Sequence, residues 1–285
     1  MKKNNAPVNP TAATAPAFRR RGAALAAAVL MTASAITVAR AEPFYFVPLA
    51  GNGSLIDHTD GSGSNARLMN PTGVAVDSAG NIYIADGGDH TVRKVTPDGS
   101  VSTLAGSSGL AGSNDGAASD ARFLYPAAIA VDAAGNVYVT DSGSHTVRKI
   151  TAGGVTTIAG TPGVAGHADG VGTAALFYAP QGIAVDGAGN VYVSDTNNST
   201  LRKISANGTV TTLAGAAGET GGADGTGASA RFNYPCGLAV DAIGDVYVAD
   251  FDNSEIRKVT PDGNVTTLAG AASQAGNADG QGNGA

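Results

Sequence analysis

The chain has 285 residues, a formal net charge of −6, 41 glycines, no tryptophan and one cysteine, Cys236. This length suits one large β domain, and the glycine content suits many tight turns. A single cysteine excludes an intramolecular disulfide, and the acidic balance argues against binding the phosphate backbone of a nucleic acid.

The first 41 residues differ from the rest in composition. Arg19–Arg21 precede an apolar run at 22–39, and the small residues Ala39 and Ala41 flank Arg40. This order is typical of a secretory signal peptide; an uncleaved membrane anchor is the alternative, because the run is long enough to approach a span. Residues 1–41 hold six of the 17 basic residues and no acidic ones, which leaves 11 basic and 23 acidic residues and a charge of −12. We therefore predict an exported protein, periplasmic, extracellular or on the cell surface, with no membrane span after signal removal.

The stretch 180–215 contains four short runs that predict four antiparallel strands. The expected strands are Gly182–Asp186, Asn190–Ser194, Thr200–Ser205 and Val210–Ala214. Turns that contain glycine separate the first strand from the second and the third from the fourth, as in an antiparallel meander.

This stretch recurs along the chain. Its head prolines are spaced 55, 54 and 55 residues apart, at Pro71, Pro126, Pro180 and Pro235. A fixed period of this kind indicates a repeat architecture, and four short strands in each repeat suit a propeller blade. We predict an all-β propeller domain over 42–285, with complete four-stranded blades at approximately 71–106, 126–160, 180–215 and 235–270.

The repeats resemble a known family. The first copy reads PTGVAVDSAGNIYIADGGDHTVRK from Pro71, and the fourth reads PCGLAVDAIGDVYVADFDNSEIRK from Pro235. This pattern looks like the NHL repeat, and the resemblance covers nearly all of 44–285. It implies a β-propeller, usually of six blades. It implies less about activity, because NHL propellers serve as RNA binders, protein scaffolds, receptor sensor domains and, rarely, enzymes.

The segments at the two ends of the repeats bear on ring closure. Residues 44–51 match the outermost strand of the later copies, and residues 271–285 match the start of a further repeat. We expect 44–51 to be a spare outermost strand, and the chain to be a fragment of a six-bladed ring that lacks on the order of 90 residues. A closed four-bladed ring is the alternative.

One end of the predicted domain is the candidate binding surface. The long connections at 51–70, 106–125, 160–179 and 215–234, together with the turns between second and third strands, share this end; we call it the long-loop face. Connections of about 20 residues often carry function. The candidate ligand contacts on this face are Asp60, Asp115, Asp169, Asp224, Asp86, Asp141, Asp195 and Asp250.

Two metal hypotheses concern the same face. The loop aspartates could bind calcium, although a calcium loop normally concentrates several oxygen ligands; the alternative is a tight turn in which Asp accepts backbone N–H groups. The histidines His58, His90, His145 and His167 could hold zinc across the propeller mouth, as in the peptidylglycine amidating lyases. The alternative is a tolerant polar turn, because Ser199 and Ser254 replace histidine in later copies.

Other recurrent residues suggest structural roles. The Arg-Lys pairs that begin at Arg93, Arg148, Arg202 and Arg257 lie inside strands, where we expect the arginine to meet a turn aspartate such as Asp86 or Asp141. We expect the recurrent tyrosines Tyr83, Tyr138, Tyr192 and Tyr247 to pack between blades rather than to form a stacking ladder for a ligand. Cys236 replaces Thr72, Ala127 and Gln181 of other copies, so we expect an inert small residue.

No nucleophile elbow, HExxH motif, phosphate loop or Cys/His cluster occurs in the sequence. We therefore predict a non-catalytic scaffold that binds a protein or a glycan through the long-loop face, with no cofactor expected. The alternative is an enzyme, a metal-assisted lyase or lactonase with His and Asp at the propeller mouth.

Overall fold

The computed structural model describes residues 49–51, 58–272, 274–276 and 279–282. The predicted signal peptide lies outside these residues, and so does most of the predicted strand at 44–51. The described part is all β, with only short 3-10 turns beside the strands. None of its helices is long and apolar enough to span a bilayer.

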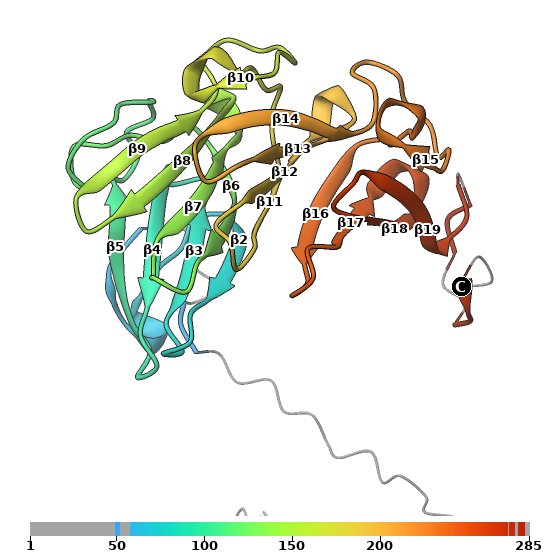
Figure 1. The fold of residues 1–285 in the computed structure, drawn as a ribbon. Helices are drawn as coiled ribbons and strands as arrows, with labels where there is room; N and C mark the ends of the chain where they lie inside the picture. The colour runs from blue at the N-terminus through green and yellow to red at the C-terminus, as the bar shows by residue number, and fades with distance from the viewer. Residues whose placement is uncertain (1–48, 52–57, 273, 277–278, 283–285) are drawn as a thin grey trace, which may run out of the picture. The chain divides into compact units, whose positions relative to one another are not determined.

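The described residues form four antiparallel sheets, one for each repeat (Figure 1). The first sheet holds β1 (Gly61–Ser62), β2 (Pro71–Val76), β3 (Ile82–Asp86), β4 (Thr91–Val95) and β5 (Ser100–Gly106). The second holds β6 (Pro126–Val131), β7 (Val137–Asp141), β8 (Thr146–Thr151) and β9 (Gly154–Ala159). The third holds β10 (Gly170–Val171), β11 (Gly182–Val185), β12 (Val191–Asp195), β13 (Thr200–Ile204) and β14 (Thr209–Ala214). The fourth holds β15 (Gly225–Thr226), β16 (Pro235–Val240), β17 (Val246–Asp250), β18 (Glu255–Val259) and β19 (Asn264–Gly270).

Each sheet is the meander that the sequence predicts. In the third, β11, β12, β13 and β14 pair in chain order. The 3-10 turns are η1 (Gly63–Asn65), η2 (Ser142–Ser144), η3 (Gly172–Ala174), η4 (Thr196–Asn198), η5 (Gly227–Ser229) and η6 (Phe251–Asn253). The all-β prediction of four-stranded blades is confirmed, whereas the six-bladed ring stays a prediction.

An aspartate fixes the turn between the first two strands of each blade. Asp186 accepts the backbone N–H groups of Ala188 and Asn190 at 2.9 and 2.8 Å. Its second oxygen accepts the Tyr192 hydroxyl at 3.2 Å. Tyr192 is 1% exposed, and its ring packs in the cluster between the third and fourth blades. Tyr83, Tyr138 and Tyr192 thus pack between blades, and all four recurrent tyrosines, Tyr247 included, donate a hydrogen bond to the aspartate of their own turn. These contacts support the structural interpretation over a ligand ladder.

The hydrophobic core lies between consecutive sheets. Because side chains alternate along a strand, each blade can bury both faces against its two neighbours. Tyr83, Ala85 and Val92 of the first blade pack against Ile129 and Val139 of the second. The same arrangement recurs between the second and third blades and between the third and fourth. Because the repeats are alike in sequence, consecutive blades form the same kind of interface each time.

A short extra strand covers the outer edge of three sheets. The long connection before a blade pairs with that blade's outermost strand: β1 with β5, β10 with β14 and β15 with β19. In the second blade, Gly116 bridges to Val155 instead. This segment pairs with some of the backbone N–H and C=O groups of the outermost strand, which would otherwise be open to pairing with another chain. The sequence did not predict it, because two residues carry no strand pattern.

Candidate functional site

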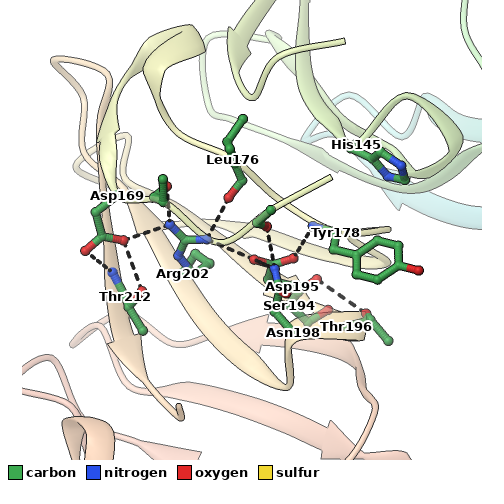
Figure 2. Close-up of polar contacts among 12 residues, drawn as sticks. His145, Asp169, Leu176, Tyr178, Ser194, Asp195, Thr196, Asn198, Arg202 and Thr212 are labelled. Atoms are coloured by element: carbon green, nitrogen blue, oxygen red, sulfur yellow. Dashed lines mark hydrogen bonds and ion pairs between the residues drawn. The ribbon is translucent and has the colours of Figure 1, made fainter. Parts of the chain in front are cut away.

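A buried arginine with two carboxylates holds each blade to its long connection, and Figure 2 shows this unit in the third blade. In the third blade, Arg202 is fully buried and lies 2.8 Å from Asp195 and 2.7 Å from Asp169. It also donates to the carbonyl oxygens of Leu176 and Ala168, both at 3.0 Å. This arginine therefore joins the end of β12 to the middle of the connection at 160–179, through Asp169, and to its last part, through Leu176.

The outer aspartate also holds the outermost strand. Asp169 accepts the backbone N–H of Thr212 at 3.2 Å and its hydroxyl at 3.0 Å. The ring of Phe177 lies 5.0 Å from the guanidinium carbon of Arg202, a stacking arrangement that suits arginine. The arginine with its two aspartates recurs, with Arg93 between Asp60 and Asp86, Arg148 between Asp115 and Asp141, and Arg257 between Asp224 and Asp250. A phenylalanine ring also lies beside the arginine in the second and fourth blades, whereas Leu68 takes its position in the first.

The eight candidate aspartates fall into two groups. The inner four, Asp86, Asp141, Asp195 and Asp250, are 0% exposed, so a ligand on the surface cannot reach them. That position corrects the expectation that they contact a ligand, and it agrees with the expected pairing of arginine with a turn aspartate. The outer four, Asp60, Asp115, Asp169 and Asp224, are about half exposed. They remain accessible, although an arginine and a threonine already bind each one.

Burial acts on the inner aspartates. It raises the pKa of Asp86, Asp141 and Asp195 to about 6, against the opposing effect of hydrogen bonds and the arginine charge. In the outer group, hydrogen bonds from Arg257 and Thr267 outweigh burial and lower the pKa of Asp224. The inner carboxylates thus behave as buried structural groups, and each remains bound to its arginine.

The four histidines do not form one metal centre. His90 accepts the backbone N–H of Tyr125 through Nδ1 at 3.3 Å, and His145 accepts that of Ala179 at 3.1 Å. His58 lies 3.8 Å from Asp89, and His167 is exposed. Among the described residues, no three His, Cys, Asp or Glu side chains gather closely enough to hold a metal ion. His90 and His145 instead join consecutive blades, and the described residues lend no support to the calcium or zinc hypotheses.

The long-loop face carries exposed apolar and aromatic side chains. Phe251 in η6 is 67% exposed, and Tyr178 and Tyr125, at the ends of two long connections, are 43% and 41% exposed. The same face also exposes Met69, Leu110, Leu124 and Val164. Clustered exposed apolar surface marks interaction sites in soluble proteins. This face is therefore the best candidate for binding among the described surfaces.

A cavity of about 700 Å³ lies along the innermost strands β2, β6, β11 and β16; we call it the axial cavity. Its polar lining includes Thr72, Tyr125, Gln181, Tyr234 and Cys236. Gln181 donates to the Tyr234 hydroxyl at 2.7 Å across the boundary between the third and fourth blades. None of the described residues that line the cavity carries a charge. The lining suits an uncharged ligand that offers both hydroxyl groups and apolar surface.

Backbone strain marks the mouth of this cavity. Tyr125 and Tyr234 have φ values of 61° and 57°, in the left-handed region, directly before a head proline. A bulky residue there is strained, and the residue before a proline normally prefers an extended backbone. Asn70 and Ala179 occupy the same position in the other blades. The strain aims the two tyrosines at the preceding blade, where Asn70 and Gln181 meet their hydroxyls.

Cys236 also lines the axial cavity. Burial, together with the nearby carboxylates Asp252 and Asp250, raises the pKa of its thiol. The thiol donates to the carbonyl oxygen of Tyr234 at 3.3 Å. The side chain thus stays protonated at neutral pH and contributes a small surface to the lining, as expected of an inert residue.

Sequence reasoning missed the axial cavity. The signal was variation between copies: Asn70, Tyr125, Ala179 and Tyr234 precede the head prolines, and Thr72, Ala127, Gln181 and Cys236 follow them. Positions that differ where the surrounding repeat is constant are not required by the blade itself. In this chain six of these eight residues line one cavity: Thr72, Tyr125, Ala127, Gln181, Tyr234 and Cys236.

Sheets of four antiparallel strands, stacked face to face and held by one repeated Arg–Asp unit, define a β-propeller repeat protein. A family model described as NHL repeat matches residues 123–150, 177–204 and 232–259. One described as Teneurin NHL domain matches residues 57–115. The chain belongs to the NHL-repeat family.

Two relatives show how much of a larger protein this chain spans. It is 31% identical over 229 residues to Teneurin-3 of Danio rerio, which covers 70% of this chain and 8% of that protein. It is 30% identical over 226 residues to Protein SUPPRESSOR OF QUENCHING 1, chloroplastic, of Arabidopsis thaliana, covering 74% of this chain and 21% of that protein. The chain thus corresponds to a small part of each relative.

A solved structure has a similar fold. It is an auxiliary nutrient binding protein from Bacteroides ovatus, with a TM-score of 0.55 and 23% identity. The match covers 72% of this chain and 50% of that one. This likeness supports the fold.

Proposed function

We propose that the protein is an exported, non-catalytic binding scaffold, and that its long-loop face binds a neutral glycan at the mouth of the axial cavity. The observation that carries the proposal is the combination of strained tyrosines at the mouth with an uncharged lining. Export rests on the composition of residues 1–41, which is typical of a signal peptide.

The exposed aromatic side chains on the long-loop face favour a glycan over other ligands. Sugar rings present apolar C–H faces that pack on aromatic side chains, while their hydroxyls need donors and acceptors. The rings of Tyr178 and Phe251 are exposed on the long-loop face, and Tyr125 and Tyr234 line the mouth. Gln181 supplies both an amide donor and an acceptor beside Tyr234.

The charge distribution supports an uncharged ligand. The outer aspartates are about half exposed and each is already bound by an arginine and a threonine, as Asp169 is by Arg202 and Thr212. The acidic chain disfavours anionic ligands. The similar Bacteroides ovatus protein is described as nutrient binding, and an uncharged saccharide belongs to that class of ligand.

An array of neutral oligosaccharides tests the proposal directly. We expect the purified protein to retain a subset of them, and Tyr234→Ala with Gln181→Ala to abolish retention. Ile243→Ala is the matched control, because Ile243 is 77% exposed and lies in the turn between β16 and β17. Retention that survives the double substitution overturns the site. Failure to retain any glycan, together with binding of peptides, points to a protein ligand, and consumption of an oligosaccharide or a lactone points to the enzyme alternative.

A further inference from the structure

The turn between the third and fourth strands has one hydrogen-bonding pattern in three of the blades. In the first and fourth blades, a threonine hydroxyl donates to the aspartate two residues later: Thr96 to Asp98 and Thr260 to Asp262. The third blade builds the same turn, between β13 and β14, with Ser205 and Asn207. The Ser205 hydroxyl donates to Oδ1 of Asn207 at 2.6 Å. A neutral amide therefore occupies the position at which two other repeats carry a carboxylate.

Two donors meet at the amide oxygen of Asn207. Besides the Ser205 hydroxyl, the backbone N–H of Thr209 donates to the same Oδ1 at 3.1 Å. Negative charge develops on this oxygen when a nucleophile attacks Cγ, and donors that already point at the oxygen stabilise that charge. The turn thus holds the side-chain amide of Asn207 in a form that is activated for attack.

The residue after Asn207 supplies the nucleophile. Gly208 has no side chain that could block the approach of its amide nitrogen to Cγ of Asn207. The N–H of Gly208 donates to the carbonyl oxygen of Ser205 at 2.8 Å, so this hydrogen bond has to open before the attack. Ala206 occupies the position of Pro97 in the first blade, and it leaves the turn easier to open because proline alone fixes φ.

We propose that Asn207 is a site of spontaneous deamidation in the folded protein. The amide nitrogen of Gly208 forms a bond with Cγ of Asn207, the Cγ–Nδ2 bond breaks, and the Gly208 proton leaves with Nδ2 as ammonia. One water molecule then opens the resulting succinimide to aspartate or isoaspartate, and water has access because Asn207 is exposed. The turn lies at the end of the blade opposite the long-loop face, so the modification does not depend on the proposed glycan site.

The aspartate product has a counterpart in the chain. Asp98 and Asp262 accept the same hydroxyl hydrogen bond at this position. We therefore expect the fold to persist after deamidation to aspartate, with one additional negative charge at the turn.

Similar side chains in other turns lack this combination of features. Asn136 and Asn190 donate through Nδ2 to the aspartate four residues earlier, at 2.7 and 2.8 Å, which holds the leaving group in place. A valine follows each of them, and its branched side chain hinders the attack. Asp98 precedes a glycine, but the hydrogen bond from Thr96 lowers the pKa of its carboxyl, and a carboxylate resists a nucleophile.

Peptide mapping by mass spectrometry tests the site. The folded protein is incubated in mildly alkaline buffer, and samples are digested at intervals. We expect the peptide with Asn207 to gain the mass difference between a carboxyl and an amide, while the peptides with Asn136 and Asn190 stay unchanged. Mapping to single peptides is required because Asn52 and Asn283 also precede a glycine. An unchanged Asn207 peptide in the folded protein overturns the proposal.

Substitutions at Ser205 test the role of the turn. Ser205→Ala removes one donor and should slow deamidation by about tenfold. Ser205→Thr keeps the hydroxyl, as Thr96 does in the first blade, and should react at the wild-type rate. In concentrated urea the turn is unfolded, so the wild type and Ser205→Ala should react equally fast, and circular dichroism checks that each variant is folded without urea. A folded Ser205→Ala protein that deamidates as fast as the wild type overturns the proposed activation, and so does a difference that persists in urea.

Discussion

Arg202 and Asp195 are both fully buried and lie 2.8 Å apart, inside a blade rather than on a binding surface. The same pair occurs in each of the four repeats. The inner aspartates, which the sequence suggested as ligand contacts, instead pair with the arginines that hold each long connection in place. The shape of the long-loop face therefore depends on these pairs.

Removing the arginine should destabilise the protein strongly. Arg202→Ala leaves the carboxylate of Asp195 buried without its cation, so we expect a loss of about 3–5 kcal/mol in the free energy of unfolding. Urea denaturation followed by circular dichroism measures the change. Lys203→Ala, the next residue on β13 and pointing to the other side, is the control and should lose less than about 1 kcal/mol. Equal effects of the two substitutions would contradict a structural role for the pair.

The close approach of β11 to β16 makes Gly182 irreplaceable. A Cβ on Gly182 would lie 1.8 Å from the carbonyl oxygen of Cys236. Gly182→Ala should therefore force the third and fourth blades apart and cost about 2–3 kcal/mol. Gly187→Ala is the matched control: no heavy atom lies within 4 Å of its Cβ position, so it should be neutral or slightly stabilising. Thermal unfolding of both variants distinguishes the two, and a neutral Gly182→Ala would show that these strands do not meet as described.

Stability should be greatest in mildly acid solution. The raised pKa values near 6 of Asp86, Asp141 and Asp195 mean that the folded state holds protons which the unfolded state releases near 3.8. Their contribution is fully present below the unfolded pKa and is lost as the pH rises through 6. In the opposite sense, the hydrogen bond from Asn81 lowers the pKa of Asp77, and that contribution disappears as the pH falls below about 4.

Urea unfolding between pH 4 and pH 8 measures this dependence. We expect the free energy of unfolding to decrease from pH 5 to pH 7, by on the order of 4 kcal/mol for the three carboxyls together. Asp195→Asn removes one of the titrating carboxyls and should flatten that slope. A wild-type stability that increases from pH 5 to pH 7 would mean that the arginines, not burial, control these carboxyls.

The sequence predicted the strands because local signals marked them. The expected strand Thr200–Ser205 is observed as Thr200–Ile204, bounded by a turn on each side. It also predicted that the strand arginines meet turn aspartates, since a buried arginine needs such a partner. It did not reveal that the outer aspartates, such as Asp169, bind the same arginine, because that contact joins residues 33 positions apart.

The axial cavity could not be predicted from the sequence, for a different reason. It depends on Tyr125 and Tyr234 adopting a left-handed backbone directly before a proline, against the local preference of that position. The same conformation recurs at Asn70 and Ala179 in the other two repeats. Local propensity fails here at the same place where the proposed binding site lies, as expected of functional sites.

Calorimetric titration of the purified protein with a panel of neutral trisaccharides tests the central claim most directly. We predict saturable binding of at least one of them, lost in Tyr234→Ala with Gln181→Ala and retained in the control Ile243→Ala. Binding that the double substitution leaves intact, or heat for anionic saccharides alone, would contradict the assignment of an uncharged glycan site to the axial cavity.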